Sequence, residues 1–139
     1  MEEKTNLAVE ANKKSIQYAM AGDKDAWLAL YTDDAVVCDP VGVSPMDPGG
    51  KGHCGKAAIE AFWDTVIGPA QLEIIPQRRW ISGEHSCCVH QVARNDMGAG
   101  KFTECDMLAV YTVNEDGLLT AMSAYWDFDD MMAQLSKLA

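Results

Sequence analysis

The sequence contains little positive charge. Its 11 lysine and arginine residues are outnumbered by 21 aspartate and glutamate residues, so the formal net charge is -10 at pH 7. Such a chain repels phosphate backbones and anionic membrane surfaces, and we expect neither nucleic acid nor a membrane as a partner. No apolar run is long enough to span a bilayer. The chain starts with acidic residues and lacks the basic and apolar regions of a signal peptide, which predicts a cytoplasmic location.

Several chemical motifs are also missing. The sequence has no CxxC pair, no glycine-rich phosphate motif, no nucleophile elbow and no internal repeat. The five cysteines lie mostly in apolar stretches, where a thiol packs as a small hydrophobe, so we interpret them as reduced. His53-Cys54 and Cys87–His90 lack zinc-site spacing, and adjacent strand residues point to opposite faces. We therefore expect no metal site and no cofactor.

The spacing of apolar residues predicts helices in the first half of the chain. Apolar residues recur at helical spacing in three segments. These are Leu7–Met20, the residues that follow the capping residue Asp23, and Ala58–Ile67. The second of these helices is expected to be short, with Tyr31 in its buried stripe. Between the second and third helices, Val43–Gly55 is too rich in proline and glycine for regular structure and is predicted to be a loop.

The second half of the chain has a period of two, which predicts strands. An early strand at Val36-Val37 is followed by four antiparallel strands and a short terminal helix, over Leu72–Ile81, Cys87–Arg94, Lys101–Val113, Leu118–Tyr125 and Phe128–Leu138. Three N-terminal helices packed on a long, bent sheet define an α+β fold. The length of 139 residues predicts a single domain over residues 1–139.

One carboxylate, Asp39, lies in the otherwise apolar run Ala35–Val41. A carboxylate at the inner end of a buried strand loses hydration, which costs free energy unless a partner or a raised pKa compensates. Such a group is a candidate base for proton transfer. Alternatively, Asp39-Pro40 starts a turn in which the carboxylate binds backbone N–H groups.

Short segments along nearly the whole chain resemble the ketosteroid isomerase branch of the NTF2-like (SnoaL-like) superfamily, especially its mycobacterial, steroid-binding members. The segments are Gly22-Asp23, Trp27–Tyr31, Asp33–Ala35, Asp39–Gly42, Gly55-Lys56 with Ala61–Trp63, and Gly117-Leu118 with Ala124–Trp126. The resemblance implies a cone, in which a strongly bent, mixed or antiparallel sheet and its covering helices enclose a ligand.

The resemblance places Asp39 at the family's general base, which takes a proton next to a ketone and returns it two carbons away. The family's oxyanion tyrosine falls on Ser15. Tyr18 lies one helical turn later on a similar face and is the candidate substitute. The alternative is that Tyr18 is a core residue with its hydroxyl at the rim.

The family's second oxyanion donor, a protonated acid, falls on Ala109. Glu104 and Asp106 have the opposite strand parity, so we expect neither in the cavity. Loss of one oxyanion donor commonly costs on the order of a hundredfold in rate, which predicts weak or altered activity. His90 is another candidate donor if it points inward; the alternative is a structural histidine.

Aromatic residues are predicted to line an apolar ligand cavity. Trp126 matches a pocket tryptophan of the family, and Trp63 takes the position of a supporting tyrosine. Phe62 and Met107 are further candidates for the wall. The alternative is that these side chains fill the core, and we favour it for Trp27 and Phe62.

Three functions fit this sequence. The first is an isomerase-like enzyme that binds a steroid or similar hydrophobic ketone, with Asp39 as base. The second is a non-catalytic binder of such a ligand, in which Asp39 only accepts a hydrogen bond. The third is a scaffold, because sheets of this superfamily commonly pair across their outer faces. A homodimer is expected, and whether the chain is an enzyme stays open at this stage.

Overall fold

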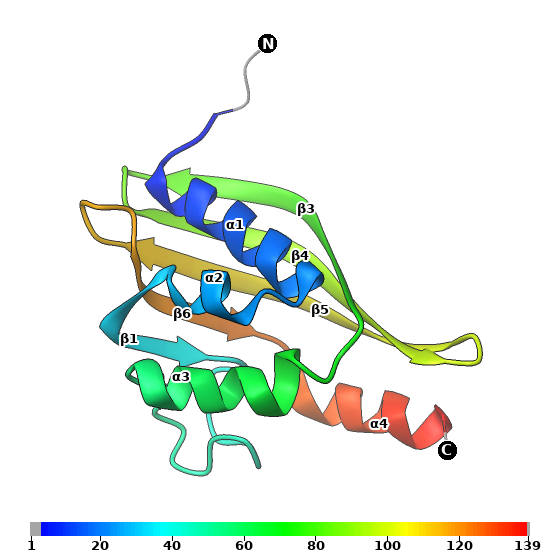
Figure 1. The fold of residues 1–139 in the computed structure, drawn as a ribbon. Helices are drawn as coiled ribbons and strands as arrows, with labels where there is room; N and C mark the ends of the chain where they lie inside the picture. Colours follow the sequence, from blue (N-terminus) through cyan, green and yellow to red (C-terminus); the bar gives the residue numbers. More distant parts are fainter. Residues whose placement is uncertain (1–3, 139) are drawn as a thin grey trace.

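A mixed six-stranded sheet organises the structure, a computed structural model that describes residues 4–138 (Figure 1). Its order is β2-β1-β6-β5-β4-β3. β1 runs parallel to β6, and every other neighbouring pair is antiparallel. The strands are β1 (Tyr31–Cys38), β2 (His53–Cys54), β3 (Leu72–Ser82), β4 (Ser86–Gly98), β5 (Lys101–Val113) and β6 (Leu119–Tyr125). The predicted α+β class and the order of helices and strands are confirmed.

Four helices complete the fold: α1 (Leu7–Ala21), α2 (Lys24–Leu28), α3 (Lys56–Phe62) and α4 (Phe128–Leu138), with a π-helical turn, η1 (Trp63–Ile67), continuing α3. Asp23 caps α2 as predicted, because its carboxylate accepts a hydrogen bond from the Ala26 N–H at 3.2 Å. α1 and α2 lie across one face of the curved sheet, α3 lies beside β1, and α4 follows β6 (Figure 1).

Two predicted boundaries are wrong. α2 ends at Leu28, and Tyr31 begins β1 instead of continuing the helix. The reason is pairing with β6: Tyr31 stands opposite Leu119, whose N–H donates to the Leu30 carbonyl at 2.7 Å. The predicted loop at 43–55 also contains β2, which pairs with β1. Long-range backbone pairing overrides the local pattern in both places.

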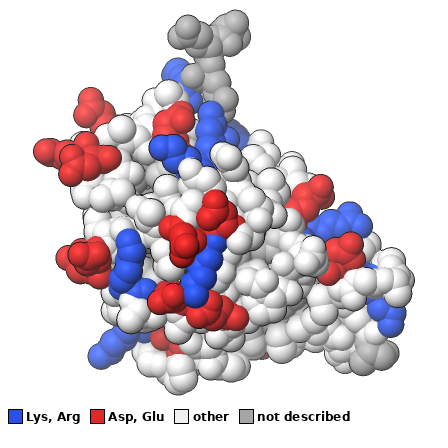
Figure 2. Space-filling model, viewed as in Figure 1, with Lys and Arg blue, Asp and Glu red and all other residues white. Residues whose placement is uncertain are grey.

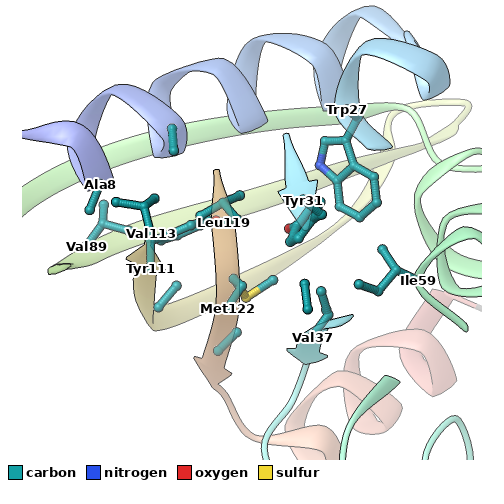
Figure 3. Packing of buried hydrophobic residues seen from close by; sticks show 14 of the residues in the cluster. Ala8, Trp27, Tyr31, Val37, Ile59, Val89, Tyr111, Val113, Leu119 and Met122 are labelled. Carbon is teal, nitrogen blue, oxygen red and sulfur yellow. The ribbon is translucent and has the colours of Figure 1, made fainter. Parts of the chain in front are cut away.

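Large aromatic rings, among them Trp27 and Tyr31, are part of the hydrophobic core (Figure 3). The Trp27 ring lies 4.9 Å from that of Tyr31 and 5.1 Å from that of Trp63, measured between centroids. All three residues are buried, as are Phe62 and Ile59. The interpretation of Trp27 and Phe62 as core residues agrees with this burial.

On the face shown in Figure 2, acidic and basic side chains are interspersed and separated by wide uncharged areas. One example joins two helices: the Lys24 ammonium lies 2.9 Å from a carboxylate oxygen of both Glu60 and Asp64. Within residues 4–138, no helix has the length and apolar character needed to cross a lipid bilayer.

Gly52 holds the 43–55 segment against the strand that carries Asp39. Its φ is +88°, and a Cβ there would meet Cys38 Sγ at 2.7 Å and Val36 Cγ1 at 2.8 Å. We expect Gly52→Ala to lower the free energy of unfolding by about 3 kcal/mol or more, because it adds steric overlap to a left-handed backbone. Urea denaturation measures this change.

Gly83 provides the matched control. Its φ is +64°, but a Cβ there meets nothing within 4 Å. Gly83→Ala should therefore cost only about 1 kcal/mol, from the backbone conformation alone. Equal losses in the two variants would show that the contact of Gly52 with β1 is unimportant.

Candidate active site

A cavity of about 270 Å³ lies between the concave face of the sheet and the helices. Its walls come from all parts of the chain: α1, α2, the end of β1, η1, the strands β3 to β6, and α4. Most of the wall is apolar. The apolar side chains include five methionines, namely Met46, Met107, Met122, Met131 and Met132. Methionine is flexible and polarizable, so such a wall adapts to the shape of a ligand.

Asp39 lies directly after β1 and faces this cavity. One of its carboxylate oxygens, Oδ1, accepts a hydrogen bond from the indole Nε1 of Trp126 at 2.5 Å. Trp126 directly follows β6, the parallel neighbour of β1. The pairing of β1 with β6 therefore brings together two side chains that are far apart in the sequence.

Burial raises the pKa of Asp39 from 3.8 to about 6, and the hydrogen bond from Trp126 opposes this rise. Loss of hydration disfavours the carboxylate, whereas the indole N–H stabilises it. The result is a carboxylate that is still largely ionised at pH 7 but more basic than an exposed aspartate. The turn interpretation of Asp39 does not account for this position, since the side chain binds Trp126 in the cavity wall.

The cavity wall contains two other titratable side chains, Cys105 and Tyr111. Burial, together with the smaller effect of nearby carboxylates, Asp39 first among them, raises the pKa of Cys105 to about 12. Burial also raises the pKa of Tyr111. Both groups therefore keep their protons at neutral pH. Asp39 is the wall residue whose protonation changes near pH 6.

Several polar side chains of the wall are deeply buried, and three of them, Gln91, Thr103 and Tyr111, were missed in the sequence. Ser15 lines the cavity and accepts a hydrogen bond from the Trp27 indole at 3.2 Å. Gln91 on β4 and Tyr111 on β5 also line it, although each is less than 5% exposed. Strand parity could have identified both, because Tyr111 lies two residues beyond Ala109 and Gln91 two residues beyond Val89.

The structure brings four of the nine residues singled out in the sequence into the cavity wall: Ser15, Asp39, Met107 and Trp126. The other five lie outside it. Tyr18 is partly buried against the core, while Phe62, Trp63 and Ala109 are buried within the core. His90 lies on the outer face of the sheet, where its Nε2 is 2.6 Å from Asp106 Oδ1. Glu104 and Asp106 are exposed, as their strand parity predicts.

The described residues contain all five cysteines as free thiols. Across residues 4–138, no three histidine, cysteine, aspartate or glutamate side chains are grouped so as to hold a metal ion.

Comparison with known proteins gives the family. A model described as a SnoaL-like domain matches residues 14–122. The chain belongs to the SnoaL-like (NTF2-like) family, because this match covers well over half of its length. The resemblance identified in the sequence is thus confirmed.

Similar proteins include several that are named for steroids. A steroid Delta-isomerase of Nocardioides simplex is 31% identical over 115 residues, which cover 82% of this chain and 85% of that protein. The structure of a Delta 5-3-ketosteroid isomerase from Mycobacterium sp. is 33% identical, with a TM-score of 0.83 over 90% of this chain and 96% of that one.

A third similar protein is RV0760c of Mycobacterium tuberculosis. Its crystal structure is 32% identical to this chain, with a TM-score of 0.85 over 92% of this chain and 96% of that one. A second structure of RV0760c contains estradiol-17beta-hemisuccinate, and it has a TM-score of 0.84 over 90% of this chain and 97% of that one.

The raised pKa of Asp39 predicts a pH-dependent stability difference. A proton on Asp39 stabilises the fold; this contribution is complete below the unfolded pKa near 3.8 and is lost as the pH rises through about 6. Asp39→Asn keeps the shape and carries no charge. We expect it to be more stable than the wild type by about 3 kcal/mol at pH 8, and by little at pH 4. Urea denaturation from pH 4 to pH 8 measures the difference.

Asp116→Asn is the control, because Asp116 is an exposed turn residue. It should show no such gain. A difference between Asp39→Asn and wild type that stays constant from pH 4 to pH 8 would contradict the raised pKa.

Proposed function

We propose that the protein binds a steroid or a similar hydrophobic ketone in the cavity and moves a carbon–carbon double bond into conjugation with the ketone. Asp39 is the base. The observation that carries this proposal is a single ionisable carboxylate with a pKa of about 6 in a mostly apolar wall. A general base works best when its pKa lies near the operating pH.

The reaction needs one proton carrier and no cofactor. The Asp39 carboxylate removes a proton from the carbon between the ketone and the double bond. The electron pair of that C–H bond forms a new carbon–carbon double bond, and the carbonyl oxygen becomes an enolate oxygen. Asp39 then returns the proton to the far carbon of the original double bond, which restores the ketone and leaves the double bond conjugated with it.

The hydrogen bond from Trp126 gives Asp39 a fixed oxygen and a free one. Oδ1 is held by the indole at 2.5 Å, which leaves Oδ2 to reach the substrate carbon. An oriented base contributes to rate because the reacting atoms are already close when the substrate binds.

The size of the cavity is compatible with a flat polycyclic ligand if α4 adjusts. Its volume of about 270 Å³ is slightly below the range of roughly 300–1,000 Å³ that is typical of ligand pockets. α4 contributes Phe128, Met131 and Met132 to the wall, and none of its residues is buried. Small movements of α4 therefore enlarge the cavity at little cost in packing.

The similar proteins support a steroid-like ligand. Two of them are named as isomerases of steroids, and RV0760c is known in complex with an estradiol derivative. Each of these has at least 31% sequence identity to this chain. These similar proteins support the class of ligand, whereas the proposed reaction is inferred from Asp39.

A second candidate function is a non-catalytic binder of the same kind of ligand. The observation that favours it is the absence of a carboxylic acid at Ala109, a buried residue on the inner face of β5. A carboxylate without strong donors for the enolate oxygen loses much of its catalytic value. In that case Asp39 accepts a hydrogen bond from the ligand.

Isomerisation of a 5-ene-3-ketosteroid tests the proposed function. The conjugated product absorbs in the ultraviolet, so the rate is followed directly. We expect wild type to catalyse the reaction, with a rate that falls as the pH drops below about 6 because Asp39 becomes protonated. Asp39→Asn should be slower by at least a hundredfold at pH 8.

Quenching of tryptophan fluorescence by the same steroid separates the two candidates. If the steroid quenches both proteins but wild type is no faster than Asp39→Asn, the protein is a binder. Absence of both quenching and turnover would rule out a steroid ligand.

We also propose that the protein is a homodimer that pairs through the outer face of its sheet. This face exposes apolar side chains, with Trp80 at 41%, Leu108 at 45% and Tyr125 at 55% exposure. It also carries both signs of charge, because Arg94 lies 3.9 Å from Glu104. A face with both features is suited to pairing with a second copy of itself.

Sedimentation velocity tests the dimer. We expect a species of twice the 15.2 kDa chain mass, and Leu108→Asp should convert it to a monomer, because a charge would be buried in the apolar contact. Val43→Asp is the control: Val43 is 76% exposed in the loop before β2, away from the outer face. A wild-type protein that sediments as a monomer at micromolar concentration would refute the dimer.

A further inference from the structure

An oxygen atom of one cavity residue lacks a hydrogen-bond partner. Gln91 lines the cavity and is 4% exposed, and its carbonyl oxygen, Oε1, is buried without a partner among the described residues. Buried atoms of Asn12, Tyr31 and Ser44 share this property, but none of these three residues lines the cavity. A buried acceptor without a partner costs free energy, which a bound donor recovers. Gln91 is therefore the residue of this set that a ligand in the cavity can complete.

The neighbours of Gln91 determine which end of its amide is left over. The amide nitrogen, Nε2, donates a hydrogen bond to the sulfur of Met107 at 3.6 Å. Gln91 also lowers the pKa of Tyr111 by hydrogen bonding, which a neighbour does when it donates to the phenol oxygen. Both contacts use the N–H side of the amide, so the carbonyl side remains for a ligand.

Met107 is the neighbour of Gln91 that yields most easily to a ligand. It stands directly opposite Gln91 in the pairing of β4 with β5, and it also lines the cavity. A thioether is a weak acceptor and the methionine side chain is flexible, so a shift of Met107 costs little free energy. Such a shift opens the covered Oε1 to a donor that enters from the cavity.

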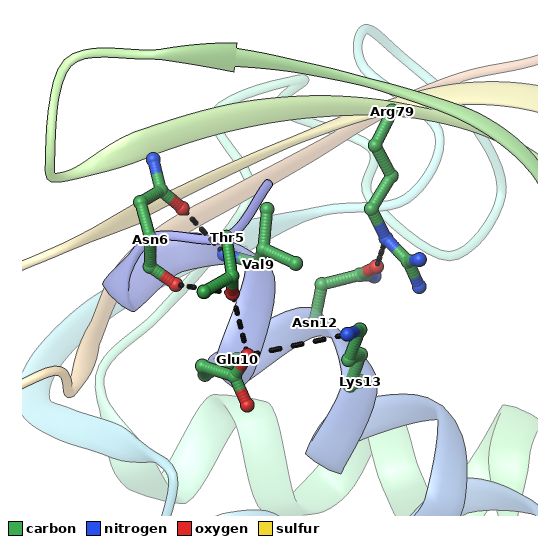
Figure 4. Close-up of polar contacts among 7 residues, drawn as sticks. All are labelled: Thr5, Asn6, Val9, Glu10, Asn12, Lys13 and Arg79. Carbon is green, nitrogen blue, oxygen red and sulfur yellow. Dashed lines mark hydrogen bonds and ion pairs between the residues drawn. The ribbon is translucent and has the colours of Figure 1, made fainter. Parts of the chain in front are cut away.

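Asn12 differs from Gln91 in its place and in the atom that it leaves over. It is completely buried on α1, and its Oδ1 accepts a hydrogen bond from Arg79 Nε at 2.9 Å (Figure 4). Its unpartnered atom is the donor Nδ2, and the residue lies outside the cavity wall. A ligand in the cavity does not contact Asn12, which makes this residue the control for Gln91.

Gln91 and Asp39 belong to different parts of the same wall. Asp39 follows β1 and Gln91 is on β4, and β6 and β5 lie between these strands in the sheet. Three strand spacings amount to about 14 Å on a flat sheet, and curvature shortens this distance. Both side chains reach inward from the sheet, so one ligand of several fused rings can contact both.

We propose that the ligand of this cavity carries a hydroxyl group at the end remote from its ketone, and that this hydroxyl donates a hydrogen bond to Gln91 Oε1. The proposal rests on the proposed function, because it concerns the same cavity and narrows its ligand class to polycyclic hydroxyketones. A ketone or an ether at that end has no proton to donate and leaves Oε1 without a partner. Gln91 therefore selects between ligands that share one ring system.

Binding of two steroids that differ in one group tests this selection. Both are 4-ene-3-ketosteroids, one with a 17-hydroxyl group and the other with a 17-ketone, and quenching of tryptophan fluorescence measures their dissociation constants. In both, the double bond is already conjugated with the ketone, so binding is measured without turnover. We expect wild type to bind the hydroxyl form roughly tenfold more tightly, since one completed buried hydrogen bond has about that effect.

Gln91→Met should remove this preference. Methionine keeps the length of the side chain and lacks the carbonyl oxygen, so we expect the hydroxyl form to bind roughly tenfold more weakly and the 17-ketone form to bind as before. The variant also loses an unpartnered buried atom, and it should therefore unfold thermally at no lower temperature than wild type.

Asn12→Leu is the matched control, because it removes a buried amide with an unpartnered atom outside the wall. Ser44→Ala serves the same purpose at a second place. Both variants should keep the wild-type preference for the hydroxyl form. Thermal unfolding of all three variants checks that the fold is intact.

The outcomes separate this proposal from the proposed function. If wild type and Gln91→Met show the same preference, the role of Gln91 is overturned and the function is unaffected. A preference for the 17-ketone that depends on Gln91 also overturns it, because the amide nitrogen would then face the ligand. If the hydroxyl preference depends on Gln91 but wild type does not isomerise a 5-ene-3-ketosteroid, the contact holds and the isomerase function is wrong. Absence of quenching by both steroids overturns both proposals.

Discussion

A carboxylate in a mostly apolar cavity is the constraint around which this structure is built. Asp39 loses most of its hydration and receives in return a hydrogen bond from the Trp126 indole at 2.5 Å. That bond exists because β1 and β6 run parallel and end side by side, where the Val41 N–H also donates to the Ala124 carbonyl at 2.9 Å. One donor offsets only part of the lost hydration, and the remainder appears as the raised pKa of Asp39. The same imbalance that weakens the fold at neutral pH makes the group a better base.

Different types of side chain form different parts of the cavity wall. The rigid rings of Trp27, Tyr31 and Trp63 pack against each other in the core, and Trp27 also forms part of the cavity wall. α4 contributes Phe128, Met131 and Met132 to the wall and is also attached to β5 by hydrogen bonds. Gln134 binds the backbone of Glu104 twice, accepting from its N–H at 2.8 Å and donating to its carbonyl at 2.7 Å. These bonds satisfy a part of β5 that extends beyond its pairing with β6. α4 is thus held in register by hydrogen bonds while its contact with the cavity is made by adaptable methionines.

Local signals in the sequence were sufficient for most of the fold and for part of the site. Caps such as Asp23 and the change of period after the third helix indicated the order of elements, and the apolar run around Asp39 indicated a buried acid. Tyr31 was misassigned because it lies four residues after Trp27, a helical spacing, whereas its strand partner Leu119 is 88 positions further along the chain. The contact of Asp39 with Trp126 is equally non-local, and so is the meeting of Asn12, Gln91 and Tyr111. Pairings between distant strands leave no local periodicity, so these contacts became visible only in three dimensions. Homodimer formation and a cytoplasmic location stay predictions.

Two titratable side chains of the cavity wall, Asp39 and Tyr111, respond differently to the same surroundings. Asp39 is partly buried and Tyr111 is buried, and the loss of hydration favours the neutral form of each. For a carboxylic acid with an ordinary pKa near 4, that shift brings the group to about 6, where it still ionises at pH 7. For a phenol, which starts at 10.0, the same shift moves the group further from ionisation. A single physical cause, the loss of hydration in one apolar cavity, therefore produces a carboxylate that titrates near neutral pH and a phenol that stays protonated, without any additional charged residue.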